Sequence, residues 1–164
     1  LLAGPHPLTN EGFRDAAYQG LAWLQAQGVD FLIDLAGPLD IPWHHGGQMA
    51  AHLETFAAET GYRFTHVQHN WTQYTPPSAA QLQELRRVLA DTLTTGHTVY
   101  LHSYRGTGRA AMAAAAYLVG QGWSPLEAWR FLGRQWAQTT WGPYRRLPDT
   151  EEQRRFLLRL TDWL

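Results

Sequence analysis

The sequence contains no cysteine, which excludes disulfides and thiolate metal ligands. It contains no lysine either, so all 13 basic residues are arginine, and they nearly balance the acidic residues to give a formal net charge of −1. Such a balance removes bulk electrostatic attraction to nucleic acid or acidic lipid. No apolar run reaches the roughly 18 residues of a membrane span, and residues 1–8 lack the charged start and apolar run of a signal peptide. We therefore expect no nucleic-acid or membrane partner.

The composition is that of a folded chain. Hydrophobic residues make up 45% of the 164 residues and charged residues 16%, which suits a single domain spanning residues 1–164. Eight tryptophans and seven tyrosines indicate a well-filled core.

Short β-like runs alternate with helical patterns along the chain. Apolar residues predict strands over 29–35, 62–69 and 97–102, and helices over 11–27, 48–59, 78–95, 109–119, 124–137 and 149–164. Ser124 with Glu127 three residues later is a capping box. This alternation predicts an α/β fold with a central, mostly parallel sheet of about four to five strands, flanked by helices on both faces. Ligands of such sheets bind beyond the carboxyl ends of strands, here after Leu35, His69 and His102.

A glycine-rich loop follows the last predicted strand and leads at Arg109 into an alanine-rich helix. Its glycines let successive backbone N–H groups turn toward one anion, and the helix start adds its positive dipole end. Arg109 can grip two phosphate oxygens in a planar fork. The pattern predicts a site for phosphate or sulfate formed by Ser103, Tyr104, Arg105, Gly106, Thr107, Gly108 and Arg109.

Two familiar phosphate loops are excluded here. No Gly-Lys-Ser/Thr follows, as a nucleotide-binding P-loop requires, and the third glycine of the dinucleotide fingerprint is missing. A plain strand–helix turn with solvated arginines is the structural alternative.

The segment from His102 to Arg109 resembles the His-Cys-X5-Arg signature of the protein tyrosine phosphatase superfamily, and most closely its dual-specificity-like branch. Four further segments resemble segments of bacterial members, in the same order along the chain. Residues 2–7 resemble the opening segment, and residues 28–35 resemble a strand that ends in Asp-Leu. Residues 76–78 resemble the end of the acid loop, and residues 147–153 resemble a tail segment.

The resemblance implies a phosphomonoester hydrolase that needs no metal or other cofactor. Residue 103 would be the nucleophile, Arg109 would stabilise the equatorial phosphate oxygens, and His102 would support the loop from behind. The implied ligands are inorganic phosphate or sulfate in the loop and a phosphorylated protein or small phosphomonoester as substrate. Phosphotyrosine, phosphothreonine, a sugar phosphate and an inositol phosphate all remain open. The implied protein is bacterial, cytoplasmic and monomeric.

The nucleophile position departs from the family because it holds Ser103. A field of N–H donors and an arginine can ionise a thiol but not a serine hydroxyl. We therefore expect this form to be inactive. Either a single catalytic cysteine was replaced to give a substrate-trapping form, or the chain is a natural pseudophosphatase that binds phosphorylated ligands without turnover. The absence of every cysteine favours the first.

The general acid is also missing from its usual place, because residues 70–77 contain no carboxylate. Asp40, in the loop after the first predicted strand, is the leading replacement, with His69 second; as an alternative, Asp40 is a turn residue before Ile41-Pro42. Ala110 replaces the Ser or Thr that often follows the arginine and assists release of phosphate.

Several histidines and arginines have weaker functional interpretations. The histidines with spacings to consider for zinc are His44, His45, His52, His66 and His69, but no HExxH helix or cysteine partner accompanies them, so we expect no metal site. Trp43, His44 and His45 are candidates for the rim of the cleft, and Tyr104 and Arg105 for shaping substrate access. Arg145 and Arg146 could meet an acidic substrate, although a solvated position is the simpler interpretation.

Overall fold

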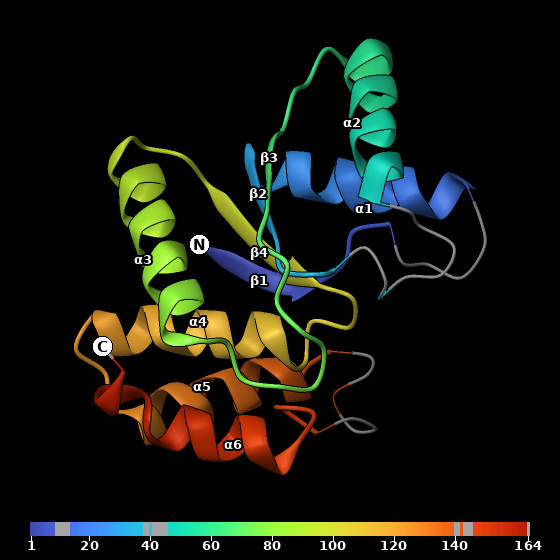
Figure 1. Cartoon of the computed structure of the whole chain (residues 1–164). Helices are drawn as coiled ribbons and strands as arrows, with labels where there is room; N and C mark the ends of the chain where they lie inside the picture. Colours follow the sequence, from blue (N-terminus) through green and yellow to red (C-terminus); the bar gives the residue numbers. More distant parts are fainter. Residues whose placement is uncertain (9–13, 38–39, 41–45, 140–141, 143–145, 164) are drawn as a thin grey trace.

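The computed structural model describes residues 1–8, 14–37, 40, 46–139, 142 and 146–163. Four strands, all parallel, form one sheet in the order β1-β4-β2-β3 (Figure 1). The strands are β1 (Leu2–Pro5), β2 (Phe31–Asp34), β3 (Thr65–Gln68) and β4 (Val99–Ser103). The predicted α/β class and parallel sheet are confirmed.

Helices connect these strands and continue beyond the last one. They are α1 (Arg14–Ala26), α2 (Gly46–Thr60), α3 (Ala79–Thr94), α4 (Arg109–Gly120), α5 (Pro125–Ala137), α6 (Glu151–Leu158) and the short 3-10 helix η2 (Leu160–Asp162). Ser124 and Glu127 form the predicted capping box at the start of α5. Among the described residues, no helix is long and apolar enough to cross a membrane.

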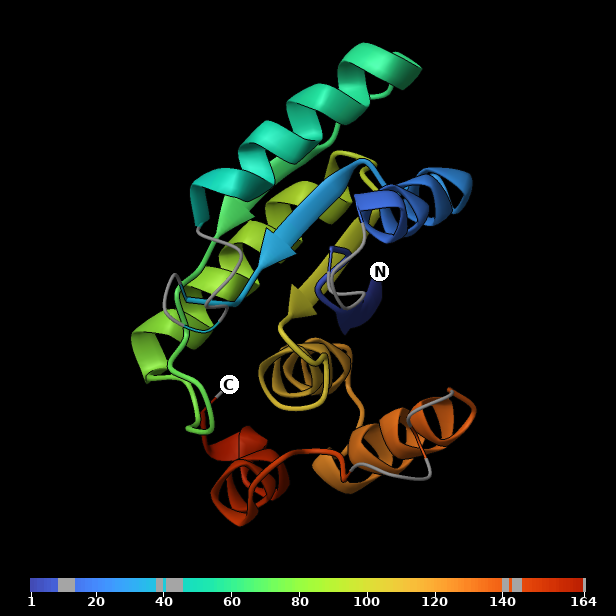
Figure 2. The same cartoon turned by 90° about the vertical axis from the view of Figure 1, so that its right-hand side faces the viewer.

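Helices cover both faces of the sheet because neighbouring strand residues point to opposite sides (Figure 2). Leu32 and Tyr100 belong to one apolar cluster with residues of α1 and α2. The next residues along the same strands, Ile33 and Leu101, belong to a second cluster with residues of α3, α4, α5 and α6. Both faces of β4 are therefore buried, which explains its continuous apolar pattern.

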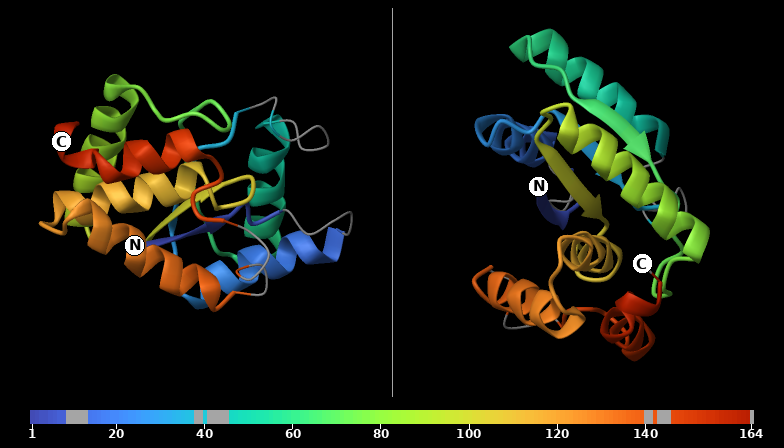
Figure 3. Two further views of the ribbon diagram at one scale, coloured as in Figure 1. Left: turned by 90° about the horizontal axis from the view of Figure 1, so that it is seen from below. Right: turned by 90° about the vertical axis from the view of Figure 1, so that its left-hand side faces the viewer.

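Helix α4 is central to the second cluster. Residues 109–116 are buried, and five of the six from Ala111 to Ala116 are alanine, so neighbouring elements can approach the helix closely. Helices α5 and α6 lie on the side of α4 away from the sheet, as a second helical layer (Figure 3). This packing fixes the amino end of α4 against the sheet.

The carboxyl ends of the parallel strands lie at the same end of the sheet, and the strand register decides which of the following loops are neighbours. Pro5 pairs with Ser103, and Asp34 pairs with His102. The segments that follow β1, β2 and β4 therefore leave the sheet side by side, as the parallel topology predicts.

Some predicted boundaries differ from the structure. The pattern did not predict β1, because four residues that include Gly4 and Pro5 carry little strand signal. The last helix, predicted to continue to residue 164, ends at Leu158 and is followed by η2. Residues 11–13 of the first predicted helix lie outside the described residues, and α1 is described from Arg14.

Candidate active site

The predicted phosphate loop runs from the end of β4 to the start of α4 and is packed on two sides. Gly106 has φ = +75°, and a Cβ there would lie 2.5 Å from the Gly4 carbonyl carbon. On the other side, Thr107 donates a 2.6 Å hydrogen bond to Asp149, the residue before the N-cap of α6. Backbone of β1 and a side chain near α6 thus hold the loop in shape.

Ser103 lies at the amino end of α4. Its side chain is buried, and its Oγ accepts a hydrogen bond of 3.4 Å from the Ala110 N–H in the first turn of the helix. Gly108 occupies the N-cap position and has no side chain that could cap the helix. An atom at the position of Ser103 Oγ therefore lies near the positive end of the helix dipole, which stabilises negative charge.

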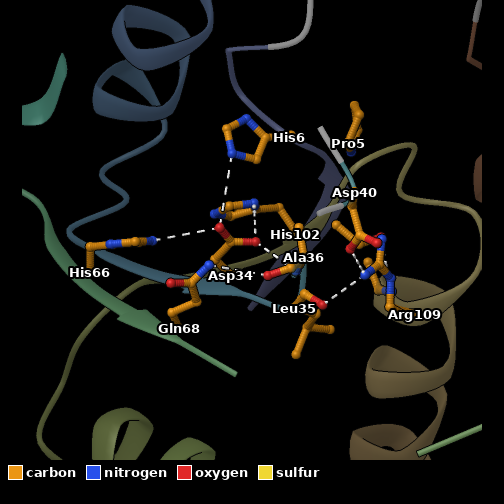
Figure 4. A network of polar contacts seen from close by, with 12 residues as sticks. Pro5, His6, Asp34, Leu35, Ala36, Asp40, His66, Gln68, His102 and Arg109 are labelled. Carbon is orange, nitrogen blue, oxygen red and sulfur yellow. Dashed lines mark hydrogen bonds and ion pairs between the residues drawn. The ribbon is translucent and has the colours of Figure 1, made fainter. Parts of the chain in front are cut away.

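Arg109 closes the loop and is almost fully buried, with 3% of its surface exposed. Its Nη1 donates to the Trp71 carbonyl at 2.9 Å and to the Leu35 carbonyl at 3.2 Å. The same nitrogen forms an ion pair with the Asp40 carboxylate (Figure 4). Asp40 also accepts a 2.5 Å hydrogen bond from the Gly37 N–H, which folds the start of this loop toward the arginine.

The structure thus brings together two residues that the sequence analysis singled out separately, Arg109 and Asp40. It also places the segment corresponding to the acid loop beside them, through the Trp71 carbonyl. A phosphate oxygen has the charge and hydrogen-bonding character of the carboxylate that pairs with this buried guanidinium, so the arrangement is chemically compatible with an anion in its place.

His102 lies behind the loop, fully buried in β4. Burial lowers the pKa of His102 to about 3, although nearby Asp34 opposes the shift, so the ring is neutral at physiological pH. Neither of its ring nitrogens has a hydrogen-bond partner among the described residues. His102 is therefore not hydrogen-bonded to Ser103, and the serine lacks a base at this position.

His69, the second candidate for the acid, follows β3 and is half-buried. Burial lowers its pKa, with Glu84 raising it and Arg87 lowering it further by smaller amounts. A histidine that binds its proton less tightly than usual is mostly neutral at pH 7 and is a poor proton donor. Of the two candidates, Asp40 is the one in contact with Arg109.

A family model described as "Polymorphic toxin system, DSP-PTPase phosphatase" matches residues 9–123 of the chain. The chain belongs to this family. The match covers every strand from β2 onward, the phosphate loop and α4, and it ends just before α5. No curated protein matches the sequence.

Solved structures of phosphatases share the fold at low sequence identity. Tk-PTP in its active form is 22% identical, with a TM-score of 0.64 over 90% of this chain and 87% of that one. PTPMT1 in complex with PI(5)P is 19% identical, with a TM-score of 0.63 over 98% and 88% of the two chains. Kinase associated phosphatase, solved with its catalytic-site cysteine substituted by serine, is 20% identical, with a TM-score of 0.60 over 92% and 80%.

Other predicted residues are placed more loosely. Tyr104 is half-buried and Arg105 is exposed, with its guanidinium carbon 5.7 Å from the centre of the Tyr104 ring. Arg146 is exposed, in agreement with the simpler interpretation. Trp43, His44, His45 and Arg145 lie outside the described residues.

Asp34, Thr107 and Trp71 form contacts that the sequence analysis did not foresee. Asp34 is a buried carboxylate at the end of β2, and its register partner is His102. A charged residue at the end of an otherwise apolar strand was the available signal, because such residues are rarely buried without partners.

The packing of the loop against β1 gives a stability test. Gly106→Ala should cost about 1–2 kcal/mol for the left-handed backbone and about 1–3 kcal/mol more for the clash with Gly4 and Pro5. Gly122→Ala is the matched control, because Gly122 has φ = +93° but open space around its Cβ position. Urea unfolding of both variants measures the difference. Equal losses would mean that the loop does not pack on β1 as described.

Proposed function

We propose that the chain is a phosphomonoester hydrolase of the dual-specificity and tyrosine phosphatase type, present here as an inactive cysteine-to-serine form. One observation carries the proposal: the side chain at position 103 lies at the amino end of α4, at one end of a loop whose other end is the buried Arg109. This arrangement suits a nucleophile held beneath a bound phosphate.

With cysteine at position 103, the reaction has two steps. The thiolate attacks phosphorus, a P–S bond forms, the P–O bond to the leaving group breaks, and the departing oxygen takes a proton from an acid. Water then breaks the P–S bond, which releases inorganic phosphate and returns the thiolate. Arg109 and the loop N–H groups stabilise the charge on the equatorial oxygens in both steps.

We propose Asp40 as the acid. Its carboxylate pairs with Arg109, the residue that would bind the phosphate. A phosphate dianion bound to Arg109 would compete for the same donor and end this pairing, which would leave the carboxylate beside the bound phosphate.

The second candidate is a natural pseudophosphatase. The observation in its favour is that Ser103 has a hydrogen bond from the Ala110 N–H but none with His102, so no base is in place to activate the hydroxyl. Such a protein would bind phosphorylated ligands without turning them over. The two candidates differ in what a thiol at position 103 would do.

The proposed substrate is a phosphorylated protein or a small phosphomonoester. The family description adds a setting, a polymorphic toxin system, and the complex of PTPMT1 with PI(5)P is an example of a phosphoinositide bound to this fold. A bacterial, cytoplasmic and monomeric protein remains our expectation.

Ser103→Cys should create or restore hydrolysis of a small aryl phosphate, because the loop then lacks nothing that the first step needs. Loss of the nucleophile costs about 10⁶-fold in a serine protease where all parts are otherwise intact, so a large gain is expected. Ser103→Ala is the control, since it keeps the loop but offers no nucleophile. A folded Ser103→Cys chain with no turnover would establish the pseudophosphatase.

Arg109→Lys should weaken binding of vanadate or sulfate to the present chain by about 1.5–3 kcal/mol, the value of a charged hydrogen bond, because lysine keeps the charge but loses the fork. Calorimetry measures the affinity, and a thermal melt checks that the variant is folded. Arg155→Lys, an exposed change on α6, should leave the affinity unchanged. Undiminished binding by the Arg109 variant would contradict the assignment of the loop.

Asp40→Asn, made together with Ser103→Cys, should slow alkyl phosphates by about 10²–10⁴-fold and activated aryl phosphates far less. An alkoxide needs a proton to leave, whereas an acidic phenol does not. The alkaline limb of the pH–rate profile for the alkyl substrate should disappear as well. Equal, small effects on both substrates would limit Asp40 to holding Arg109.

A further inference from the structure

A second polar cluster lies behind the phosphate loop, on the other side of Leu35 from Arg109 (Figure 4). Its centre is Asp34, a carboxylate with 4% of its surface exposed. Three imidazole nitrogens approach this carboxylate: His102 Nδ1 at 3.5 Å, His66 Nε2 at 3.8 Å and His6 Nε2 at 3.9 Å. The histidines come from β4, β3 and the end of β1, so three strands deliver them to the end of a fourth.

These separations are too long for hydrogen bonds. An N–H···O bond spans 2.7–3.2 Å, and an atom that far out of range gains little from a carboxylate. His66 Nε2 and both nitrogens of His102 are accordingly buried without a hydrogen-bond partner among the described residues. Unpaired buried nitrogens are costly and call for a partner.

The same separations fit a metal ion between the groups. Nitrogen and oxygen ligands about 2.0–2.1 Å from a tetrahedral Zn²⁺ lie about 3.3–3.4 Å from one another. The 3.5 Å between His102 Nδ1 and Asp34 Oδ1 is close to that value, and the 3.9 Å between His6 Nε2 and Asp34 Oδ2 exceeds it by about half an ångström. One ligand atom each from His6, Asp34 and His102 also lie within 4.8 Å of one another.

We propose that His6, Asp34 and His102 form a binding site for a divalent transition-metal ion of the zinc type. Two imidazoles and one carboxylate suit zinc and its neighbours in the first transition row, whereas Mg²⁺ and Ca²⁺ prefer oxygen ligands alone. The sequence predicts no metal site, because no HExxH helix or cysteine partner accompanies the histidines considered there, and neither His6 nor His102 is among them.

One contact changes on binding. The Leu8 N–H donates to His6 Nδ1 at 3.3 Å, so a neutral His6 carries its proton on Nε2 and faces Asp34 with a donor. A metal-bound His6 carries its proton on Nδ1 and exposes the lone pair of Nε2 to the ion. Binding therefore breaks the 3.3 Å hydrogen bond from the Leu8 N–H to His6 Nδ1 and forms a metal–nitrogen bond at His6 Nε2.

The ion would be structural, because it lies behind the loop and His102 separates it from residue 103. It takes no part in the proposed phosphoryl transfer. The metal site therefore does not depend on whether the chain hydrolyses phosphate esters, and metal binding alone tests it.

The experiment uses the untagged chain, since a histidine tag would bind the same ions. The protein is stripped with a chelator, loaded with Zn²⁺, dialysed and analysed for bound metal; a chelator competition then gives the affinity. We expect one ion per chain. Replacement by Co²⁺ should give the intense visible absorption of a tetrahedral cobalt site.

Two variants test the ligands, and one provides the control. Asp34→Asn removes the central anion, and His6→Gln removes one of the two imidazoles. Each should weaken binding by more than the 10–100-fold that loss of an outer-shell partner costs. His97→Gln should bind the metal as the parent chain does. His97 lies before the amino end of β4, at the other end of the strands, in a hydrogen-bonded pair with Asp30 at 2.8 Å.

One ion per chain, lost in Asp34→Asn and His6→Gln but kept in His97→Gln, supports the site. If Asp34→Asn does not fold by circular dichroism, His6→Gln decides alone. No retained ion, or equal retention by folded His6→Gln and parent chains, overturns the proposal.

Discussion

The burial of the Arg109 guanidinium determines how the loops at the carboxyl ends of the strands pack together. Arg109 is removed from water almost completely, and a buried charge must find partners close at hand. Its partners are the Leu35 carbonyl, the Trp71 carbonyl and the Asp40 carboxylate, from the segments that follow β2 and β3. The arginine thereby ties the loop after β4 to both neighbouring loops, and the position of each depends on the other two.

The groups proposed to bind the anion are different from the group proposed to attack it. In the proposed function, backbone N–H groups, a helix end and Arg109 would bind the anion, and none of these requires a thiol. The proposed chemistry rests on the ionisation of a single atom at position 103. A chain with serine there keeps the shape and charge of the site while lacking a nucleophile, and this combination is equally useful to an experimenter who traps substrates and to a binding protein.

Local rules explain which parts of the structure were predictable. Ser124 with Glu127, and the glycines between β4 and α4, act through neighbours in sequence, so their patterns are visible without a structure. The pairing of β1 with β4 joins residues nearly a hundred positions apart, and Gly4 and Pro5 weaken the strand pattern itself. Asp40 could be named as a candidate from its place after a strand, but its contact with Arg109 depends on how two loops fold together. The grouping of Asp34 with three histidines likewise follows from strand order, which no single segment reveals.

The place of β1 in the sheet has a consequence for how the site forms. Among the described residues, β1 pairs only with β4, and the predicted phosphate loop packs on the backbone of β1 through Gly106. Contacts of such long sequence separation close large loops and form slowly. During synthesis, residues 2–5 must wait until residues 100–103 have been made before they can pair. One wall of the candidate active site is thus completed late in folding, and until then the edge of β4 is open to other strands.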